Sequence, residues 1–95
     1  MKPLYEWDEK KAKENLRKHK VSFEEAETVF DDPLSITVVD PDHSTEEERW
    51  IDIGTSKKKQ ILVVVYTERE KNIRIISVGK ATRAERKKYE KENTP

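Results

Sequence analysis

Six side chains in the sequence could together hold a phosphate group and move a proton. They are the cations Arg49, Arg69, Arg74, Lys80 and Arg83, and the histidine His19, which a further cation, Lys20, follows. Arginine presents a planar fork of donors to phosphate oxygens, and histidine exchanges protons near neutral pH. RNA cleavage by attack of the ribose 2′-hydroxyl needs little more, because the substrate supplies its own nucleophile. Cations fixed beside the phosphate often make the largest contribution to such a reaction.

Each of these side chains also has an ordinary structural explanation. Arg69 lies between two glutamates, which favours an exposed ion pair in a turn. Arg74 can pair with a carboxylate such as Asp52 across a sheet. His19 at a helix C-terminus is stabilised by the helix dipole without any catalytic role, and the basic run 83–91 is typical of a solvated helix face. The residues by themselves leave both explanations open.

Other chemistries find little support. Two isolated glycines, Gly54 and Gly79, cannot form a phosphate-cradling loop, and no serine sits in the strained turn that a serine nucleophile needs. The chain has no cysteine, and the segment 40–43 (Asp-Pro-Asp-His) is a weak metal motif without a second histidine nearby. We therefore expect no metal ion and no cofactor.

The strongest structural pattern is the stretch Gln60–Lys80, which predicts two strands, Ile61–Tyr66 and Ile73–Val78, joined by the five-residue loop Glu68–Asn72. The first strand is apolar at every position, which indicates a central strand covered on both faces. In the second strand, simple alternation puts Ile73, Ile75 and Ser77 on one face and Arg74, Ile76 and Val78 on the other. An arginine is thereby built into the most hydrophobic strand pair of the chain.

The remaining elements follow from shorter patterns. Helices are predicted at Glu9–His19 after the cap Asp8, at Ser22–Phe30, and from Arg83 to about Glu92. Two further strands are predicted at Ser35–Asp40 and Arg49–Thr55, a loop at Pro41–Glu47, and the aromatic segment 5–7 is a candidate edge strand. Ser22 with Glu25, and Thr82 with Glu85, fit the capping box, and Phe23, Ala26, Val29 and Phe30 form an inward stripe. The last helix has only Ala84 and Tyr89 as apolar anchors.

This order predicts an α+β fold with two N-terminal helices, a four-stranded antiparallel sheet and a C-terminal helix, the helices being packed on one sheet face. At 95 residues we expect a single domain, 1–95. No apolar run approaches the roughly 18 residues that span a bilayer, and no signal-type segment follows the first residues, so we expect a cytoplasmic protein with no membrane partner.

The charge is distributed unevenly, although the net charge is zero. Residues 1–48 hold 14 acidic and 7 basic residues (−7), and residues 49–95 hold 6 acidic and 13 basic residues (+7). A basic second half is compatible with nucleic-acid binding. Mutual neutralisation of the two halves within the fold is the alternative.

Three long segments resemble the BrnT family of bacterial type II toxins: YEWDEKKAKENLRKHKVSFEEAETVFDDP, DPDHSTEEERWIDIG and LVVVYTEREKNIRIISVGKATRAERKKYE. The resemblance runs from about Tyr5 to Glu90. Its signature pieces are Trp7-Asp8 with Asn15 and His19, the segment 23–33, His43 with Glu48-Arg49, and Tyr66-Thr67 through Arg74 to Ser77.

That resemblance implies a RelE-like microbial ribonuclease fold and endoribonuclease activity on an RNA substrate. It also implies a BrnA-like ribbon-helix-helix antitoxin that silences the toxin, with operator DNA contacted only through that antitoxin. Carried over by position, the implied site is His19, Arg49, Arg69, Arg74, Ser77 and Lys80, to which the residues themselves add Arg83. Among these, His19, Arg74 and Lys80 are the expected catalytic groups.

One position departs from the family pattern. Related sequences commonly continue Ile-Ser-Ala with a cation, whereas Gly79 stands at that place here. Loss of a phosphate-contacting arginine removes a charge-assisted contact of about 1.5–3 kcal/mol. The departure is compatible with a weaker ribonuclease or with Lys80 acting alone. It also favours a second hypothesis, a catalytically silent module that acts with its antitoxin as a transcriptional co-repressor, whereas the retained Arg49, Arg69 and Arg74 favour the ribonuclease.

Overall fold

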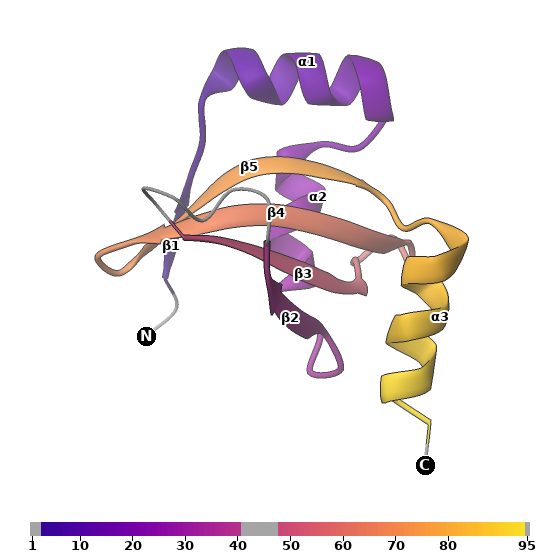
Figure 1. Ribbon diagram of the computed structural model, residues 1–95. Helices are drawn as coiled ribbons and strands as arrows, with labels where there is room; N and C mark the ends of the chain where they lie inside the picture. The colour runs from indigo at the N-terminus through magenta and orange to yellow at the C-terminus, as the bar shows by residue number, and fades with distance from the viewer. Residues whose placement is uncertain (1–2, 41–47, 95) are drawn as a thin grey trace.

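The computed structural model describes residues 3–40 and 48–94, which form a five-stranded sheet with three helices around it (Figure 1). The strands are β1 (Leu4–Glu6), β2 (Ile36–Val39), β3 (Arg49–Thr55), β4 (Ile61–Arg69) and β5 (Asn72–Lys80), in the spatial order β1-β5-β4-β3-β2. The helices are α1 (Glu9–His19), α2 (Phe23–Val29) and α3 (Arg83–Glu92). The predicted α+β class is confirmed.

The prediction of four antiparallel strands is wrong in number and in kind. The segment 4–6 forms a fifth strand, β1, which pairs in parallel with β5 and makes the sheet mixed. The other neighbouring strands are antiparallel. The segment 5–7 is a candidate edge strand from the sequence, but the partner of β1 lies 68 residues further along the chain (Leu4 pairs with Asn72), so no local pattern assigns β1 to this sheet.

Helix α2 covers one face of the sheet and forms the core with it. Its side of the core consists of Phe23, Ala26 and Val29, as the sequence predicts, and the sheet contributes Leu62, Val64, Tyr66, Ile75 and Val78. The helix begins at the cap Ser22, whose hydroxyl accepts from the Glu25 backbone N–H at 3.0 Å. The Glu25 carboxylate does not serve the predicted capping box, because it turns to the β3–β4 turn and accepts from Ser56 and Gln60.

Helix α1 lies beside the edge of the sheet rather than on its face (Figure 1). Asn15 makes the connection: its amide nitrogen donates to the carbonyls of Val78 and Val21, and its oxygen accepts from the Val78 N–H. The buried carboxamide therefore hydrogen-bonds to the backbone of β5 at Val78, beyond the three β5 residues that pair with β1. The expectation that all helices pack on one face is wrong for this reason.

Helix α3 stands at the far end of the sheet (Figure 1) and is attached mainly through Tyr89. The tyrosine hydroxyl donates to Asp32 at 2.6 Å and lies 3.0 Å from the Thr55 hydroxyl. The capping box of Thr82 and Glu85 is present as predicted. Ala84, the other predicted anchor, is exposed, so the helix has one buried apolar side chain.

The β4–β5 hairpin differs from its prediction in two respects. The strands continue to Arg69 and resume at Asn72, so the predicted five-residue loop is a turn of two residues, Glu70 and Lys71, with Glu70 at φ 56°. A β-bulge shifts the register where Val65 pairs with Ser77 and Tyr66 with Ile75. The residue between, Ile76, is the extra one, and simple alternation fails there.

The bulge changes which residues share a face. Ile75 and Val78 both lie in the core, although simple alternation would separate them. Arg74 and Ser77, in contrast, pair with Thr67 and Val65, which alternate with the core residues of β4 and so belong to the face opposite α2. We call this the front face of the sheet.

Candidate functional site

The front face brings two of the predicted arginines into one row. Arg49 of β3 pairs with Thr67 of β4, which pairs with Arg74 of β5, which pairs with Glu6 of β1. Paired residues project from the same face, and neighbouring strands lie about 4.8 Å apart, so the two arginine backbones are separated by roughly 10 Å. Two half-buried guanidinium groups on either side of a small residue can hold the oxygens of one phosphate.

Arg74 has a carboxylate neighbour, but it is not Asp52 as proposed from the sequence. Its Nη1 lies 4.0 Å from Glu6 Oε2, and about a third of each side chain is exposed. An ion pair at this distance and exposure is weak. The guanidinium is therefore oriented by Glu6 while its donors stay accessible to a ligand.

Asp52 faces the core side of the sheet, where its carboxylate accepts two hydrogen bonds. Its Oδ1 accepts from the hydroxyls of Thr37 at 2.6 Å and Tyr66 at 3.0 Å. Burial raises the pKa of Asp52 above its ordinary value, although the two hydrogen bonds oppose the change. Burial and the neighbouring Asp52 carboxylate also raise the pKa of the Tyr66 hydroxyl.

His19 ends α1 and lies against β5 at the position of the family departure. A Cβ atom added to Gly79 would stand 3.9 Å from His19 Nδ1, which is ordinary contact. A side chain at position 79 would therefore begin beside the imidazole without displacing it. His19 itself is exposed, and its position follows from Lys20, whose left-handed backbone (φ 60°) ends the helix.

The remaining predicted residues are spread along the hairpin and do not converge. Arg69 lies beside the hairpin turn, Ser77 shares the front face with Arg74, and Arg83 begins α3. Lys80 closes β5, six residues or about 20 Å from Arg74, and pairs with Leu62, whose side chain faces α2. The structure thus brings together Arg49 with Arg74, and His19 with position 79, as two separate clusters.

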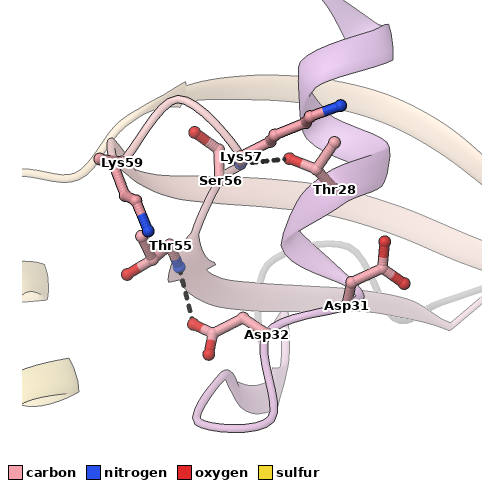
Figure 2. Close-up of a pocket in the computed structure, with 7 residues that line it drawn as sticks. All are labelled: Thr28, Asp31, Asp32, Thr55, Ser56, Lys57 and Lys59. Atoms are coloured by element: carbon pink, nitrogen blue, oxygen red, sulfur yellow. Dashed lines mark hydrogen bonds between the residues drawn. The ribbon is translucent and has the colours of Figure 1, made fainter.

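A hollow of about 360 Å³ lies between the end of α2 and the β3–β4 turn (Figure 2). It is lined by Thr28, Asp31, Asp32, Thr55, Ser56, Lys57 and Lys59. Figure 2 shows two hydrogen bonds that fix its wall, from the Lys57 N–H to the Thr28 hydroxyl and from the Thr55 N–H to Asp32. Because both signs of charge line it, this hollow has no clear preference for a phosphate.

Asp32 is held in its ionised form by its hydrogen bonds. Desolvation alone would raise the pKa of this carboxyl, but donation by the Thr55 N–H, the Tyr89 hydroxyl and the Leu34 N–H together lower it. The carboxylate accordingly serves as a structural acceptor that ties α3 to the sheet. It is not positioned as a proton donor.

Residues 3–40 and 48–94 contain no group of three or more histidine, aspartate or glutamate side chains placed to hold a metal ion. Asp42 and His43 of the weak metal motif, together with the predicted loop 41–47, lie outside the described residues. Among the predicted site residues, those that could hold a phosphate are Arg49 and Arg74 on the front face, and Lys80 and Arg83 near α3.

Comparison with known proteins decides the family. A family profile described as the ribonuclease toxin BrnT of a type II toxin–antitoxin system matches residues 7–85. The chain belongs to the BrnT family. The crystal structure of the Brucella abortus ribonuclease toxin BrnT has a similar fold, with a TM-score of 0.60 and 24% identity over 87% of this chain and 99% of that one. Curated protein sequences gave no match.

The BrnT-like fold replaces the broader RelE-like expectation as the description that the comparisons support. Within the described residues, none of the helices is both long enough and apolar enough to cross a membrane.

Two candidate residues in this BrnT-family chain were missed by sequence reasoning. Glu6 belongs to no catalytic motif in the sequence, and it lies beside Arg74 only because β1 pairs with β5. Thr67 is almost fully buried between the two arginines and donates to the Glu48 carbonyl at 3.0 Å. The predicted strand ends at Tyr66, one residue before Thr67, and the bulge shifts the register of Arg74, so pairing the predicted strands would not have found the Thr67 row.

Proposed function

We propose that this protein is the endoribonuclease of a type II toxin–antitoxin pair and cuts RNA by attack of the ribose 2′-hydroxyl, without a metal ion. Family membership over residues 7–85 supports the activity class. The single geometric observation that supports the site is the row in which Arg49 and Arg74 flank Thr67 on the front face. These two arginines hold the scissile phosphate and stabilise the negative charge that develops on it.

The reaction also needs a group that accepts the 2′-hydroxyl proton and a group that protonates the leaving oxygen. Glu6 stands beside Arg74, and its carboxylate is a possible acceptor at the phosphate that the arginines hold. His19, the proton-transfer group expected from the sequence, lies beside Gly79, five strand residues or about 16 Å along β5 from Arg74. We therefore propose Glu6 as the acceptor of the 2′-hydroxyl proton at Arg74 and keep His19 as the competing candidate. The 5′-oxygen leaves as the cyclic phosphate forms, and it takes its proton from solvent water at this partly exposed site.

The partner of such a toxin is an antitoxin. We infer that a ribbon-helix-helix antitoxin of the BrnA type binds this single domain, silences it in the cytoplasm and brings the complex to operator DNA. The class of partner is supported by the family's type II toxin–antitoxin description. A ribbon-helix-helix reading frame next to the gene would support the antitoxin type.

The decisive experiment is incubation of the purified chain with end-labelled single-stranded RNA in EDTA, followed by analysis of the fragment ends. We expect cyclic 2′,3′-phosphate ends with the wild type, and their loss in Arg74→Ala. Arg17→Ala is the matched control, because Arg17 is an exposed arginine on α1 outside the site. Glu6→Gln and His19→Gln then decide between the two proton acceptors, since only the true acceptor lowers the rate by the roughly 10²–10⁴-fold typical of such groups.

One observation favours a second function, the catalytically silent co-repressor. Gly79 leaves the flank of the His19 imidazole without the cation that related sequences commonly carry. If folded wild-type protein leaves the RNA intact while Gly79→Arg cleaves it, the natural chain is the silent module. If both leave it intact, the ribonuclease proposal fails.

A further inference from the structure

A second hollow, of about 280 Å³, lies where the β3–β4 turn, the end of β5 and the start of α3 meet. It is lined by Lys59, Gln60, Ile61, Lys80, Ala81 and Arg86. Three of these six residues are cations, none is an acid, and each cation comes from a different element. The positive charge of this hollow is therefore not the by-product of one solvated helix face. We call this feature the α3 hollow.

The backbone around the α3 hollow is fixed by hydrogen bonds. Lys59 has a left-handed backbone (φ 67°), and its N–H donates to the Ser56 carbonyl at 2.9 Å. The Ser56 N–H donates to the Gln60 carbonyl at 2.8 Å, and the Ala81 N–H donates to the Ile61 carbonyl at 3.0 Å. The backbone positions that carry the cations are thus fixed, and only the exposed side chains have to be ordered when a ligand binds.

The positive charge of the hollow is not neutralised from within. In the part of the chain that the structure describes, Lys59, Lys80 and Arg86 form no ion pair with a carboxylate. The acid behind the wall, Glu25, is buried and accepts from the side chains of Ser56 at 2.6 Å and Gln60 at 2.8 Å. An anionic ligand would supply the missing counter-charge.

The α3 hollow continues along the helix. A neighbouring hollow of about 530 Å³ is lined by Ala81, Arg83, Arg86, Lys87 and Glu90, and it shares Ala81 and Arg86 with the first. Four different cations therefore follow one another from Lys80 to Lys87, with Glu90 the single acid at the outer end. A series of this kind suits a polyanion with several phosphates better than a small anion.

We propose that the α3 hollow binds backbone phosphates of single-stranded RNA outside the nucleotide that is cut. The ligand class rests on the proposed ribonuclease function, whereas the site itself rests on the three converging cations. Lys80, expected among the catalytic groups, belongs by position to this site, because it lines the hollow and lies about 20 Å from Arg74. The α3 hollow thus extends the RNA footprint from the front face to the far end of β5.

The test is equilibrium binding of a 2′-O-methyl RNA 12-mer to the full chain at several salt concentrations. Methylation blocks attack by the 2′-oxygen, so binding is measured even if the wild type cannot cut. The variant Lys59→Gln/Arg86→Gln is expected to bind about tenfold more weakly and to lose about 1.4 from the salt slope, two contacts at about 0.7 each. The control Lys58→Gln/Lys88→Gln removes the same charge from the same turn and helix at residues that line neither hollow, and its affinity is expected to stay within about twofold.

Each other outcome overturns the proposal. An unchanged affinity in the Lys59/Arg86 variant would show that the α3 hollow does not bind RNA. An equal loss of affinity in both double variants would show that binding depends only on the total charge of the chain. An equal loss with a 12-base-pair duplex DNA removes the assignment to single-stranded RNA. Failure of the ribonuclease proposal is recognised separately, because it leaves unmodified RNA uncut while the binding difference between the two double variants persists.

Discussion

The molecule contains the same pair of side chains, an aspartate and a tyrosine, in two environments that act on the carboxyl in opposite directions. Asp52 accepts from Tyr66 and Thr37 through a single oxygen inside the sheet core, and burial raises its pKa. Asp32 accepts from Tyr89 and from two backbone N–H groups through both oxygens, and its pKa is lowered.

The difference teaches that the depth of burial and the number of donors together, and not the tyrosine, set the direction in which each carboxyl pKa moves. A buried carboxylate with donors on one oxygen is poorly compensated for its lost hydration. A carboxylate with three donors, two of them from the backbone, is stabilised in its charged form even after partial burial. The first pair lies in the core of the sheet, and the second holds α3, the helix that bears Arg86 of the α3 hollow.

Removal of the charge from Asp32 should give the largest effect. In Asp32→Asn one oxygen becomes an N–H₂ group, so at least one of the three donors loses its acceptor. We expect the free energy of unfolding at pH 7 to fall by about 2–3 kcal/mol, the usual cost of a lost hydrogen bond to a charged group. Urea denaturation measures this, with Asp52→Asn under identical conditions as the reference. A loss no larger than that of the reference would remove the distinction between the two pairs.

A smaller effect is expected from Tyr89→Phe, which keeps the ring in place and removes the hydroxyl. The free energy of unfolding should fall by about 1–2 kcal/mol, and amide exchange should accelerate in α3 while the amides of β4 and β5 change little. Tyr5→Phe is the matched control, because within the described residues the Tyr5 hydroxyl has no hydrogen-bond partner and its ring packs on Phe30. Uniform acceleration throughout the sheet would show that α3 is not attached separately.

The smallest change at neutral pH is expected from Asp52→Asn. The asparagine oxygen can still accept from Thr37 and Tyr66, so the free energy of unfolding should change by less than about 1 kcal/mol at pH 7. Its sharper signature is pH dependence. Because the folded pKa of Asp52 lies above its ordinary value of 3.8, this group favours folding below 3.8 and loses that contribution as the pH rises through the folded pKa.

Asp32 has the opposite linkage, since its lowered pKa contributes stability above 3.8 that is lost as the pH falls through the folded pKa. Unfolding at pH 4 and pH 7 separates the two. The free energy of unfolding of Asp52→Asn, relative to the wild type, should be higher at pH 7 than at pH 4. That of Asp32→Asn should be lower at pH 7 than at pH 4. A matching trend in both variants would contradict the comparison.

Local chemistry in the sequence was sufficient for the helices and for strand β3. Asp8, Ser22 and Thr82 each accept the expected backbone N–H, and the bounds of α1 and β3 agree with their prediction. These features depend on residues within one turn or one strand. Capping residues and alternation are therefore reliable when no distant partner intervenes.

Features that depend on distant partners could not be predicted in the same way. The bulge at Ile76 has no signature in its own strand, yet it moves Val78 into the core and puts Arg74 and Ser77 on the other face. The partner of Arg74 is Glu6 because of a parallel pairing that only the folded sheet defines. The candidate arginines were identifiable by type, and their grouping into one row was not.

The carboxamide of Asn15 has a consequence for solubility. An unpaired strand edge can recruit a strand from another copy of the chain and so begin aggregation. Along β5, one of the two most hydrophobic strands, β1 covers Asn72–Arg74, and Asn15 occupies both backbone groups of Val78. The buried Asn15 side chain thus prevents an incoming strand from pairing with the end of β5 at Val78. Without it, a longer β1 would be needed to cover this part of the edge.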